Sequence, residues 1–122
     1  MNDCIFCKIV KGEIPCNKVY ENKQILAFLD IHPTNKGHTL IIPKEHYADL
    51  TETPDNILSE LSKTIKEIGP KIVDAVNANG FNVISNVKAA AGQVIFHTHV
   101  HIIPRFEGDG FSNAAEVAVF PF

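Results

Sequence analysis

The sequence predicts an α+β domain built on an antiparallel sheet, and three features of the chain support this prediction. Several short apolar runs are separated by turn residues, as is typical of strands. One longer stretch repeats apolar residues every three or four positions, as is typical of a helix. The other connections are too short for crossover helices, so a small α/β fold is the weaker alternative.

Length and composition indicate one globular domain that spans residues 1–122. Hydrophobic residues make up 45% of the chain and charged residues 20%, both close to the averages for folded domains. The formal net charge of -3 argues against a nucleic-acid or anionic-membrane partner, because both require a basic surface. No apolar run approaches the roughly 18 residues of a membrane-spanning helix, and no signal peptide is visible. We therefore expect a cytoplasmic protein.

In the first half of the chain we expect a short helical turn and three strands. The helical turn covers residues 4–10 and ends before Gly12. Two strands at residues 18–21 and 24–30 are joined by a tight turn. A loop then leads to a third strand at residues 37–43, whose continuous apolar run predicts that it is buried.

The longest expected element is a helix with an apolar face. Thr51 or Thr53 is expected to cap its start. Pro70 is expected to kink the helix or to split it into two pieces, and Asn79-Gly80 to end it. The apolar residues that define its face are Ile57, Leu61, Ile65, Ile68, Ile72 and Val76.

The last part of the chain predicts two more strands. They cover residues 81–86 and 94–104 and flank a loop of small residues at 88–92. The C-terminal residues 117–122 are apolar, and we expect them to pack on the domain or on a partner subunit, because exposed apolar surface is unfavourable.

Three of the six histidines alternate along the last predicted strand. Because alternate residues of a strand share a face, His97, His99 and His101 are expected to line up, with Thr98 and Val100 behind them. Neighbouring histidines would be ~7 Å apart and the outer two ~13 Å apart, so one metal ion could bind two neighbours but not all three. A single histidine is commonly a hydrogen-bonded core residue, whereas this pattern indicates a functional site.

Cys4 and Cys7 form a Cys-x-x-Cys pair near the start of the chain. A redox pair requires a preceding strand, which is missing here, and an odd count of three cysteines argues against a disulfide framework. A structural zinc site requires two further ligands, which one histidine of the alternating set and His46 can supply. Cys16 has no partner at motif spacing.

Polar residues and a glycine near the predicted strands suggest contacts with a ligand. Asn86 and the pair Gly92-Gln93 precede the histidines, and glycine lets backbone N–H groups approach an anion closely. The same loop also fits an ordinary hairpin connection. Asp30 ends a predicted strand, where it suits either hydrogen bonds to sugar hydroxyls or the capping of a turn.

Four ordered blocks of the chain resemble the histidine triad (HIT) nucleotide-binding proteins, and most closely their Hint-like branch with a zinc site. Residues 97–103 match the family signature His-φ-His-φ-His-φ-φ, with threonine at the first φ position as a mild departure. Residues 4–15, residues 27–31 followed by 37–46, and the Gly-Gln pair supply the other blocks. The resemblance implies a five-stranded antiparallel sheet and a homodimer with a continuous larger sheet.

The resemblance also implies a role for each matching residue. His99 would attack the α-phosphorus of a purine nucleotide and form a covalent nucleotidyl-histidine, with His101 and Gln93 as further catalytic residues. Val94 stands where Hint-like members often carry a serine that helps to protonate the leaving group. The nucleotide-binding residues implied are Phe6, Ile9, Phe28, Asp30, Ile31, Asn86, Gly92, Gln93, Val94, His99 and His101. The implied ligands of a structural Zn²⁺ are Cys4, Cys7, His46 and His97.

The resemblance therefore implies a nucleotide hydrolase or nucleotidyl transferase, with adenosine 5'-phosphoramidate as the expected substrate. The alternatives are a dinucleoside polyphosphate hydrolase and a nucleotide-binding regulatory protein with vestigial catalysis. The intact His99 favours an enzyme. A zinc hydrolase with catalytic histidine ligands would require a nearby carboxylate as general base, and the candidate Glu107 lies beyond Pro104.

Overall fold

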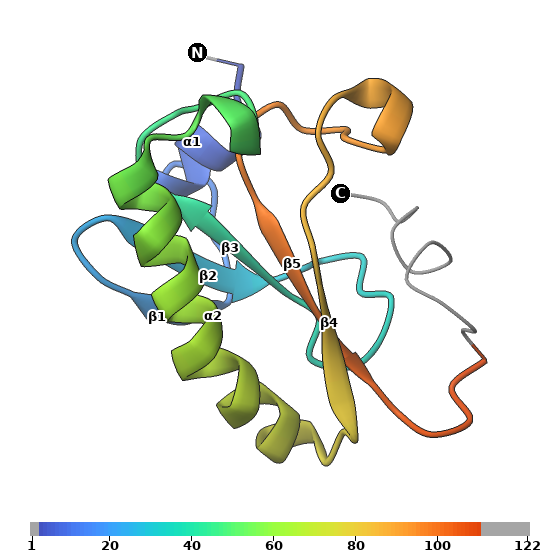
Figure 1. Ribbon diagram of the computed structural model, residues 1–122. Helices are drawn as coiled ribbons and strands as arrows, with labels where there is room; N and C mark the ends of the chain where they lie inside the picture. The colour runs from blue at the N-terminus through green and yellow to red at the C-terminus, as the bar shows by residue number, and fades with distance from the viewer. Residues whose placement is uncertain (1–2, 111–122) are drawn as a thin grey trace.

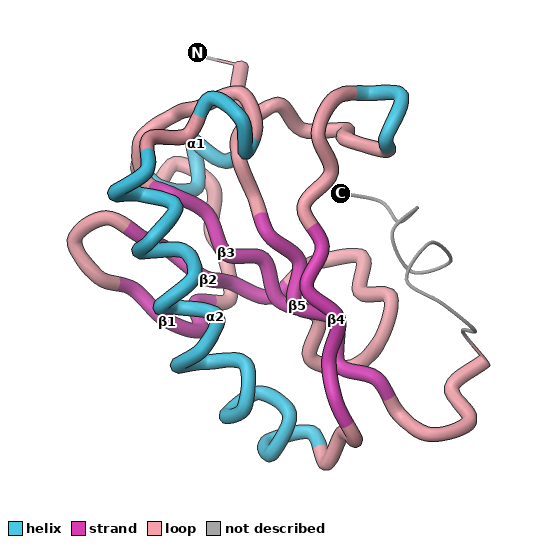
Figure 2. The backbone as a smooth tube through the Cα atoms, in the orientation of Figure 1, coloured by secondary structure: helices cyan, strands magenta, loops and turns pink. Residues whose placement is uncertain are grey.

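The computed structural model describes residues 3–110 and shows a five-stranded antiparallel sheet in the order β1-β2-β3-β5-β4 (Figures 1 and 2). The predicted α+β class, the five antiparallel strands and the two helices are confirmed. The predicted packing of residues 117–122 lies outside the described residues. The strands are β1 (Lys18–Glu21), β2 (Ile25–Leu29), β3 (Thr39–Pro43), β4 (Gly80–Ile84) and β5 (Val100–Arg105). The helices are α1 (Ile5–Val10) and α2 (Asp55–Val76), with short 3₁₀ turns at Leu50–Glu52 and Ala89–Ala91.

Each face of the sheet is covered by one of the two helices. Alternate residues of a strand point to opposite faces, so Ile25 and Ala27 of β2 join the core under α2, while Leu26 and Phe28 join the core beside α1. Helix α1 contributes Phe6 to this second core, where the ring is 1% exposed. A six-residue helix is too short to be stable alone, so α1 depends on this packing.

Helix α2 begins after Pro54, and neither of the predicted cap residues caps it. Thr51 lies in the preceding 3₁₀ turn, and the hydroxyl of Thr53 donates to the carbonyl of Asp49 at 2.8 Å. The prediction was wrong because these hydroxyls serve the segment before the helix rather than its first turn.

The predictions for the interior and the end of α2 were also wrong in part. The helix is continuous from Asp55 to Val76, so Pro70 does not split it. Pro70 is exposed, where water can replace the hydrogen bond that its ring removes. Asn77 has a φ of 60° and ends the helix before the predicted Asn79-Gly80. Within residues 3–110, no helix is both long and apolar enough to cross a membrane.

The last strand begins later than predicted. β5 starts at Val100, so residues 94–99 form an irregular segment, and β4 ends at Ile84 rather than at residue 86. The predicted alternation of faces is nevertheless retained. Val100 packs in the core under α2, while His101 pairs across the strands with Leu40, which belongs to the core beside α1.

Three segments meet at one end of the sheet, at the top of Figure 1. They are α1, the segment of residues 44–54 that follows β3, and the connection of residues 85–99 between β4 and β5. A backbone hydrogen bond of 2.8 Å from Thr98 N to Tyr47 O joins the last two. Irregular segments held by a rigid sheet are where binding and catalytic groups are commonly found.

Candidate functional site

An apolar cavity of about 250 Å³ lies between α1 and the sheet. The structure brings together there the four residues that the resemblance implied for a purine slot, Phe6, Ile9, Phe28 and Ile31. Sequence reasoning missed the other lining residues, which are Ile5, Ile14, Pro15, Cys16, Asn17 and Leu29. The rings of Phe6 and Phe28 meet edge to face with centroids 5.6 Å apart. The cavity therefore offers apolar and aromatic walls to a flat ligand.

Asp30 stands in the sequence between the lining residues Leu29 and Ile31 and is not itself among the residues that line the cavity. One carboxylate oxygen, Oδ1, accepts a hydrogen bond from His32 N at 2.8 Å. The other, Oδ2, is buried and has no hydrogen-bond partner among the described residues. Burial raises the pKa of Asp30 to about 6. An acceptor of this kind suits a ligand hydroxyl, because a buried acceptor without a partner is unfavourable.

All three alternating histidines are buried, on the side of the sheet that carries α1. The ring of Phe6 contacts His97 and His99 edge to face, with centroid distances of 5.8 and 5.1 Å. Nδ1 of His99 lies 2.7 Å from the carbonyl oxygen of its neighbour His97. A carbonyl can only accept, so Nδ1 carries the proton and the lone pair of the neutral ring lies on Nε2. This tautomer leaves His99 ready to act as a nucleophile through Nε2.

His38 is a site residue that sequence reasoning missed. It lies two residues before Leu40, which pairs with His101, so His38 and His101 are diagonal neighbours on one face. Nε2 of His38 is 2.9 Å from Nδ1 of His101 and 3.5 Å from Oδ2 of Asp30. The signal was available in the predicted strand at residues 37–43, where positions 38, 40 and 42 share a face.

The direction of the hydrogen bond between His38 and His101 follows from the backbone. Thr34 N donates to Nδ1 of His38 at 3.0 Å, so the proton of the neutral ring is on Nε2 and points to His101. Burial lowers the pKa of His38 to about 4, which keeps the ring neutral near pH 7. Nδ1 of His101 therefore accepts, and its Nε2 carries a proton that can be donated to an anion.

The four predicted metal ligands form one cluster. The ligand atoms of Cys4, Cys7, His46 and His97 all lie within 4.8 Å of one another. Nδ1 of His97 is 3.4 Å from Sγ of Cys4 and 3.6 Å from Sγ of Cys7, and Nδ1 of His46 is 3.3 Å from Sγ of Cys7. In a tetrahedral zinc site, Zn–S bonds of ~2.3 Å and Zn–N bonds of ~2.05 Å place sulfur and nitrogen ~3.5 Å apart.

The chemistry of this donor set also fits a zinc ion. Nε2 of His97 donates to the carbonyl of Pro43 at 2.8 Å, so the lone pair on Nδ1 faces the two thiols. Such a backbone acceptor commonly orients a histidine that binds zinc. Burial lowers the pKa of His97 to about 4, which keeps the lone pair available. Burial raises the pKa of the Cys7 thiol, and a divalent cation would reverse this effect.

A second cluster, Asp30, His38 and His101, does not fit a metal in the same way. Its donor atoms also lie within 4.8 Å of one another. However, Nδ1 of His38 already accepts from Thr34 N, so Nε2 holds the proton and has no lone pair for a cation. Hydrogen bonds from Thr34 to His38 and from His38 to His101 instead orient His101, and Oδ2 of Asp30 lies 3.5 Å from Nε2 of His38.

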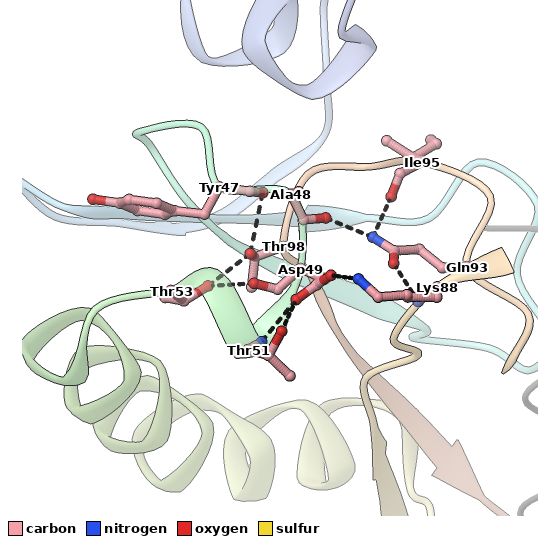
Figure 3. A network of polar contacts seen from close by, with 9 residues as sticks. All are labelled: Tyr47, Ala48, Asp49, Thr51, Thr53, Lys88, Gln93, Ile95 and Thr98. Atoms are coloured by element: carbon pink, nitrogen blue, oxygen red, sulfur yellow. Dashed lines mark hydrogen bonds and ion pairs between the residues drawn. The ribbon is translucent and has the colours of Figure 1, made fainter.

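The side chain of Gln93 is fully used by backbone groups, as Figure 3 shows. Its Oε1 accepts from Lys88 N at 2.7 Å, and its Nε2 donates to the carbonyls of Ala48 at 2.7 Å and Ile95 at 3.1 Å. The side chain is also buried. In this structure Gln93 therefore fixes the connection between β4 and β5, and the catalytic role that the resemblance implied would require these bonds to open.

The other predicted nucleotide-binding residues lie along the same connection. Asn86 is half-buried just after β4, and Gly92 is exposed with a φ of 96°, a conformation that glycine adopts readily. Val94 is 61% exposed and does not line the apolar cavity. It lines a separate hollow of about 290 Å³ together with Cys4 and Phe96.

A polar network that sequence reasoning missed holds this connection against the segment before α2 (Figure 3). Oδ1 of Asp49 accepts from the backbone N and the hydroxyl of Thr51 at 2.8 and 2.6 Å, and Oδ2 accepts from Nζ of Lys88 at 3.1 Å. These contacts lower the pKa of Asp49, and the hydrogen bond from the Thr51 hydroxyl has the largest effect. The hydroxyls of Thr53 and Thr98 are 2.7 Å apart, which anchors the residue between His97 and His99.

Comparison with known proteins supports the same fold. Adenylylsulfatase HINT3 of Arabidopsis thaliana is 52% identical over 108 residues, which are 88% of this chain and 55% of that protein, so the chain spans about half the length of that relative. Adenosine 5'-monophosphoramidase hnt1 of Schizosaccharomyces pombe is 47% identical over 102 residues, which are 84% of this chain and 74% of that protein. The crystal structure of a zinc-bound histidine triad family protein from Mycobacterium smegmatis has a TM-score of 0.86 at 35% identity, covering 97% of this chain and 91% of that one.

The family model for the HIT domain matches residues 11–108. This range contains the five strands, helix α2 and the three alternating histidines. The match, the identities and the shared fold agree with the signature at residues 97–103, and the chain therefore belongs to the HIT domain family.

Proposed function

We propose that the protein hydrolyses purine nucleotides at the α-phosphate through a covalent intermediate on His99, with adenosine 5'-phosphoramidate as its substrate. Membership of the HIT family makes it a nucleotide-binding protein, and relatives named as an adenylylsulfatase and an adenosine monophosphoramidase support a nucleotide hydrolase in general. The observation that carries the proposal is the position of His99, whose lone pair lies on Nε2 and whose ring contacts the cavity residue Phe6.

Two displacements at phosphorus would complete the reaction. In the first, Nε2 of His99 bonds to the α-phosphorus, the phosphorus–nitrogen bond breaks, and the leaving amine takes up a proton from solvent. In the second, water attacks the phosphorus, the bond to Nε2 breaks, and the proton lost by the water passes to solvent. Throughout, the Nε2 proton of His101 is placed for donation to a phosphate oxygen, since its Nδ1 accepts from His38.

The nucleoside would occupy the cavity beside α1. Phe6 and Phe28 supply aromatic edges for a purine, and Ile31, which is 68% exposed, supplies a surface that a bound base would cover. Oδ2 of Asp30, the residue between the lining residues Leu29 and Ile31, would accept a ribose hydroxyl. These contacts select a nucleoside and leave the choice of leaving group to the residues around His99.

A second candidate substrate is adenylyl sulfate, favoured by the 52% identity to a relative named as an adenylylsulfatase. Sulfate leaves as a stable anion and needs no proton, whereas an amine must be protonated. Val94 provides no hydroxyl at the position where the resemblance implied a serine. Dinucleoside polyphosphates form the third class to be compared.

We also propose that Cys4, Cys7, His46 and His97 hold a structural zinc ion. Support comes from the cluster itself and from the zinc-bound family structure. A bound Zn²⁺ would supply charge that keeps both thiols deprotonated, and it would link α1 to the two segments that carry the histidines. With four protein ligands the site would be closed and structural.

A homodimer paired through the β4 edge is the third part of the proposal. β4 lies at one edge of the sheet, and its residue Val83 is 48% exposed. Next to it, α2 and β4 border a hollow of about 440 Å³ whose lining includes Leu58 and Ile65. Two such edges could join in a continuous sheet and cover both hollows.

The substitution His99→Ala is expected to reduce turnover by at least about 10³-fold, because it removes the nucleophile. Affinity for AMP and zinc content should stay near their wild-type values. Rapid mixing with labelled adenosine 5'-phosphoramidate, adenylyl sulfate and diadenosine tetraphosphate, followed by acid quench, would trap any nucleotidyl-enzyme and rank the three substrates. His32→Ala, which alters an exposed histidine, is the matched control. Turnover by His99→Ala at the wild-type rate would refute the nucleophile.

Zinc content measured by atomic absorption is expected to be near one ion per chain. Cys4→Ser should lose most of the zinc and lower the melting temperature by roughly 5–15 °C, because α1 loses its link to the histidine segments. Cys16→Ser, which alters the thiol outside the cluster, should change neither quantity by much. A wild-type protein purified without zinc that binds none on titration would contradict the proposed site.

Stability is expected to depend on pH through Asp30. Because its folded pKa of about 6 is above the ordinary 3.8, the stabilisation from its protonated form is complete below about pH 4 and is lost as the pH rises through 6. Relative to Asp30→Asn, the wild type should therefore lose up to about 3 kcal/mol of its free energy of unfolding between pH 4 and 7.5. Its melting temperature should fall over the same range. Asp74→Asn, at an exposed position of α2, is the control. The same dependence of the melting temperature on pH in wild type and in Asp30→Asn would exclude this effect.

Sedimentation equilibrium is expected to give the mass of a dimer for the wild type. Val83→Asp places a charge on the β4 edge and should shift the protein toward monomer, because the charge would be buried on pairing. Val19→Asp makes the same change at an exposed position of β1, at the opposite edge, and should leave the dimer intact. A wild-type monomer, or equal dissociation by both variants, would contradict the proposed interface.

A further inference from the structure

The connection between β4 and β5 contains an unfavourable backbone conformation at Lys88. This residue has φ and ψ of 74° and 159°, a combination that essentially only glycine adopts without strain. A side chain in that conformation persists only when surrounding contacts hold it in place. The connection carries Asn86, Gly92 and Gln93 and leads directly to His97 and His99, so its shape affects the whole phosphate side of the proposed site.

Hydrogen bonds hold both the backbone N–H and the backbone carbonyl of Lys88. Lys88 N donates to Oε1 of Gln93 at 2.7 Å, while Lys88 O accepts from Ala91 N at 3.0 Å and from Gln93 N at 3.2 Å. Residues 88–93 thus close into a compact loop around Gln93. The amide of Gln93 in turn bonds the carbonyl of Ala48. The three contacts that Lys88 makes here use only its backbone, and alanine or glycine at this position could make them equally well.

The side chain of Lys88 adds a contact that smaller residues cannot make. Its Nζ lies 3.1 Å from Oδ2 of Asp49, and the lysine side chain is 70% exposed while that of Asp49 is 3% exposed. The buried carboxylate belongs to the segment that carries His46, and the carbonyl of Asp49 also accepts from Thr53. Because the lysine is mostly in solvent, its removal would leave no cavity; Oδ2 of the buried carboxylate would lose its contact with Nζ, while Oδ1 would keep the two hydrogen bonds from Thr51.

We infer that Lys88 and Asp49 form a latch that holds residues 88–93 in the shape required for α-phosphate transfer, with both acting as positioning residues. This inference rests on the proposed function. The ion pair offsets the strain at Lys88 and joins the phosphate side of the site to the segment of His46. The ammonium serves the reaction through Asp49 and makes no contact with the substrate.

Four variants separate the strain from the latch. Lys88→Ala keeps the strain and removes the latch, so kcat should fall by about tenfold or more, with a smaller change in KM because the cavity beside α1 is untouched. Lys88→Gly removes both, and kcat should stay within about threefold of wild type. Asp49→Asn should lower kcat severalfold in wild type and by less than about twofold when combined with Lys88→Gly, because no latch is then left to lose. Lys63→Ala, which removes an exposed lysine paired with Glu60, is the matched control.

Wild-type kcat in Lys88→Ala would overturn the inference. An equal loss in Lys88→Gly and Lys88→Ala would also overturn it, because the ammonium would then act on the substrate itself. Amide hydrogen exchange at Ala91 and Gln93 tests the latch without any substrate, and we expect it to be about tenfold faster in Lys88→Ala and Asp49→Asn. Unchanged exchange in both variants would refute the latch even with an active enzyme. A wild-type protein that shows neither turnover nor a nucleotidyl-enzyme would refute the proposed function. The hydrogen-exchange test of the latch would remain valid in that case.

Discussion

Three buried histidines of the site, His38, His97 and His99, each have one ring nitrogen fixed by the backbone, and this constraint decides what the other nitrogen can do. The carbonyl of Pro43 holds the proton of His97 on Nε2, and the carbonyl of His97 holds the proton of His99 on Nδ1. At His38 the backbone group is a donor instead, because Thr34 N donates to Nδ1, so the proton of this ring lies on Nε2. His97 therefore presents a lone pair to the thiols, and His99 presents one toward a substrate. His38 presents a proton to His101.

This division of roles depends on burial as well as on hydrogen bonding. His38 and His97 have pKa values lowered to about 4, mainly by burial, so that near pH 7 each ring is neutral and has a single defined tautomer. Helix α1 provides much of the cover, because Phe6 packs against both His97 and His99. The same six-residue helix carries Cys7, follows Cys4 and lines the apolar cavity. A zinc ion bound there would thus stabilise the wall of the nucleotide site without taking part in the chemistry.

Periodicity along the chain was enough to predict the fold and the shared face of the histidines. The spacing of the apolar residues located α2, and the alternation at residues 97–101 held even though β5 begins only at Val100. Local signals failed where a distant residue decided the outcome. Thr53 suits a helix cap, yet its hydroxyl donates to Asp49 and lies beside that of Thr98, a contact across 45 positions that no local pattern reveals. His38 is different, since its place in the predicted strand indicated the shared face, and only its contact with His101, 63 positions away, was hidden.

Lys88 shows why part of the site lay beyond sequence reasoning altogether. A positive φ is usually inferred from glycine or asparagine, and a lysine gives no such signal. The conformation becomes intelligible only once Gln93 and Asp49 are seen to hold the residue from two sides. Gln93 contributes contacts that depend on the backbone alone, whereas Asp49 contributes one that depends on the side chain. A loop built in this way is kept in shape by the segment before α2, so the geometry at the phosphate side and the geometry around His46 are set by the same few hydrogen bonds.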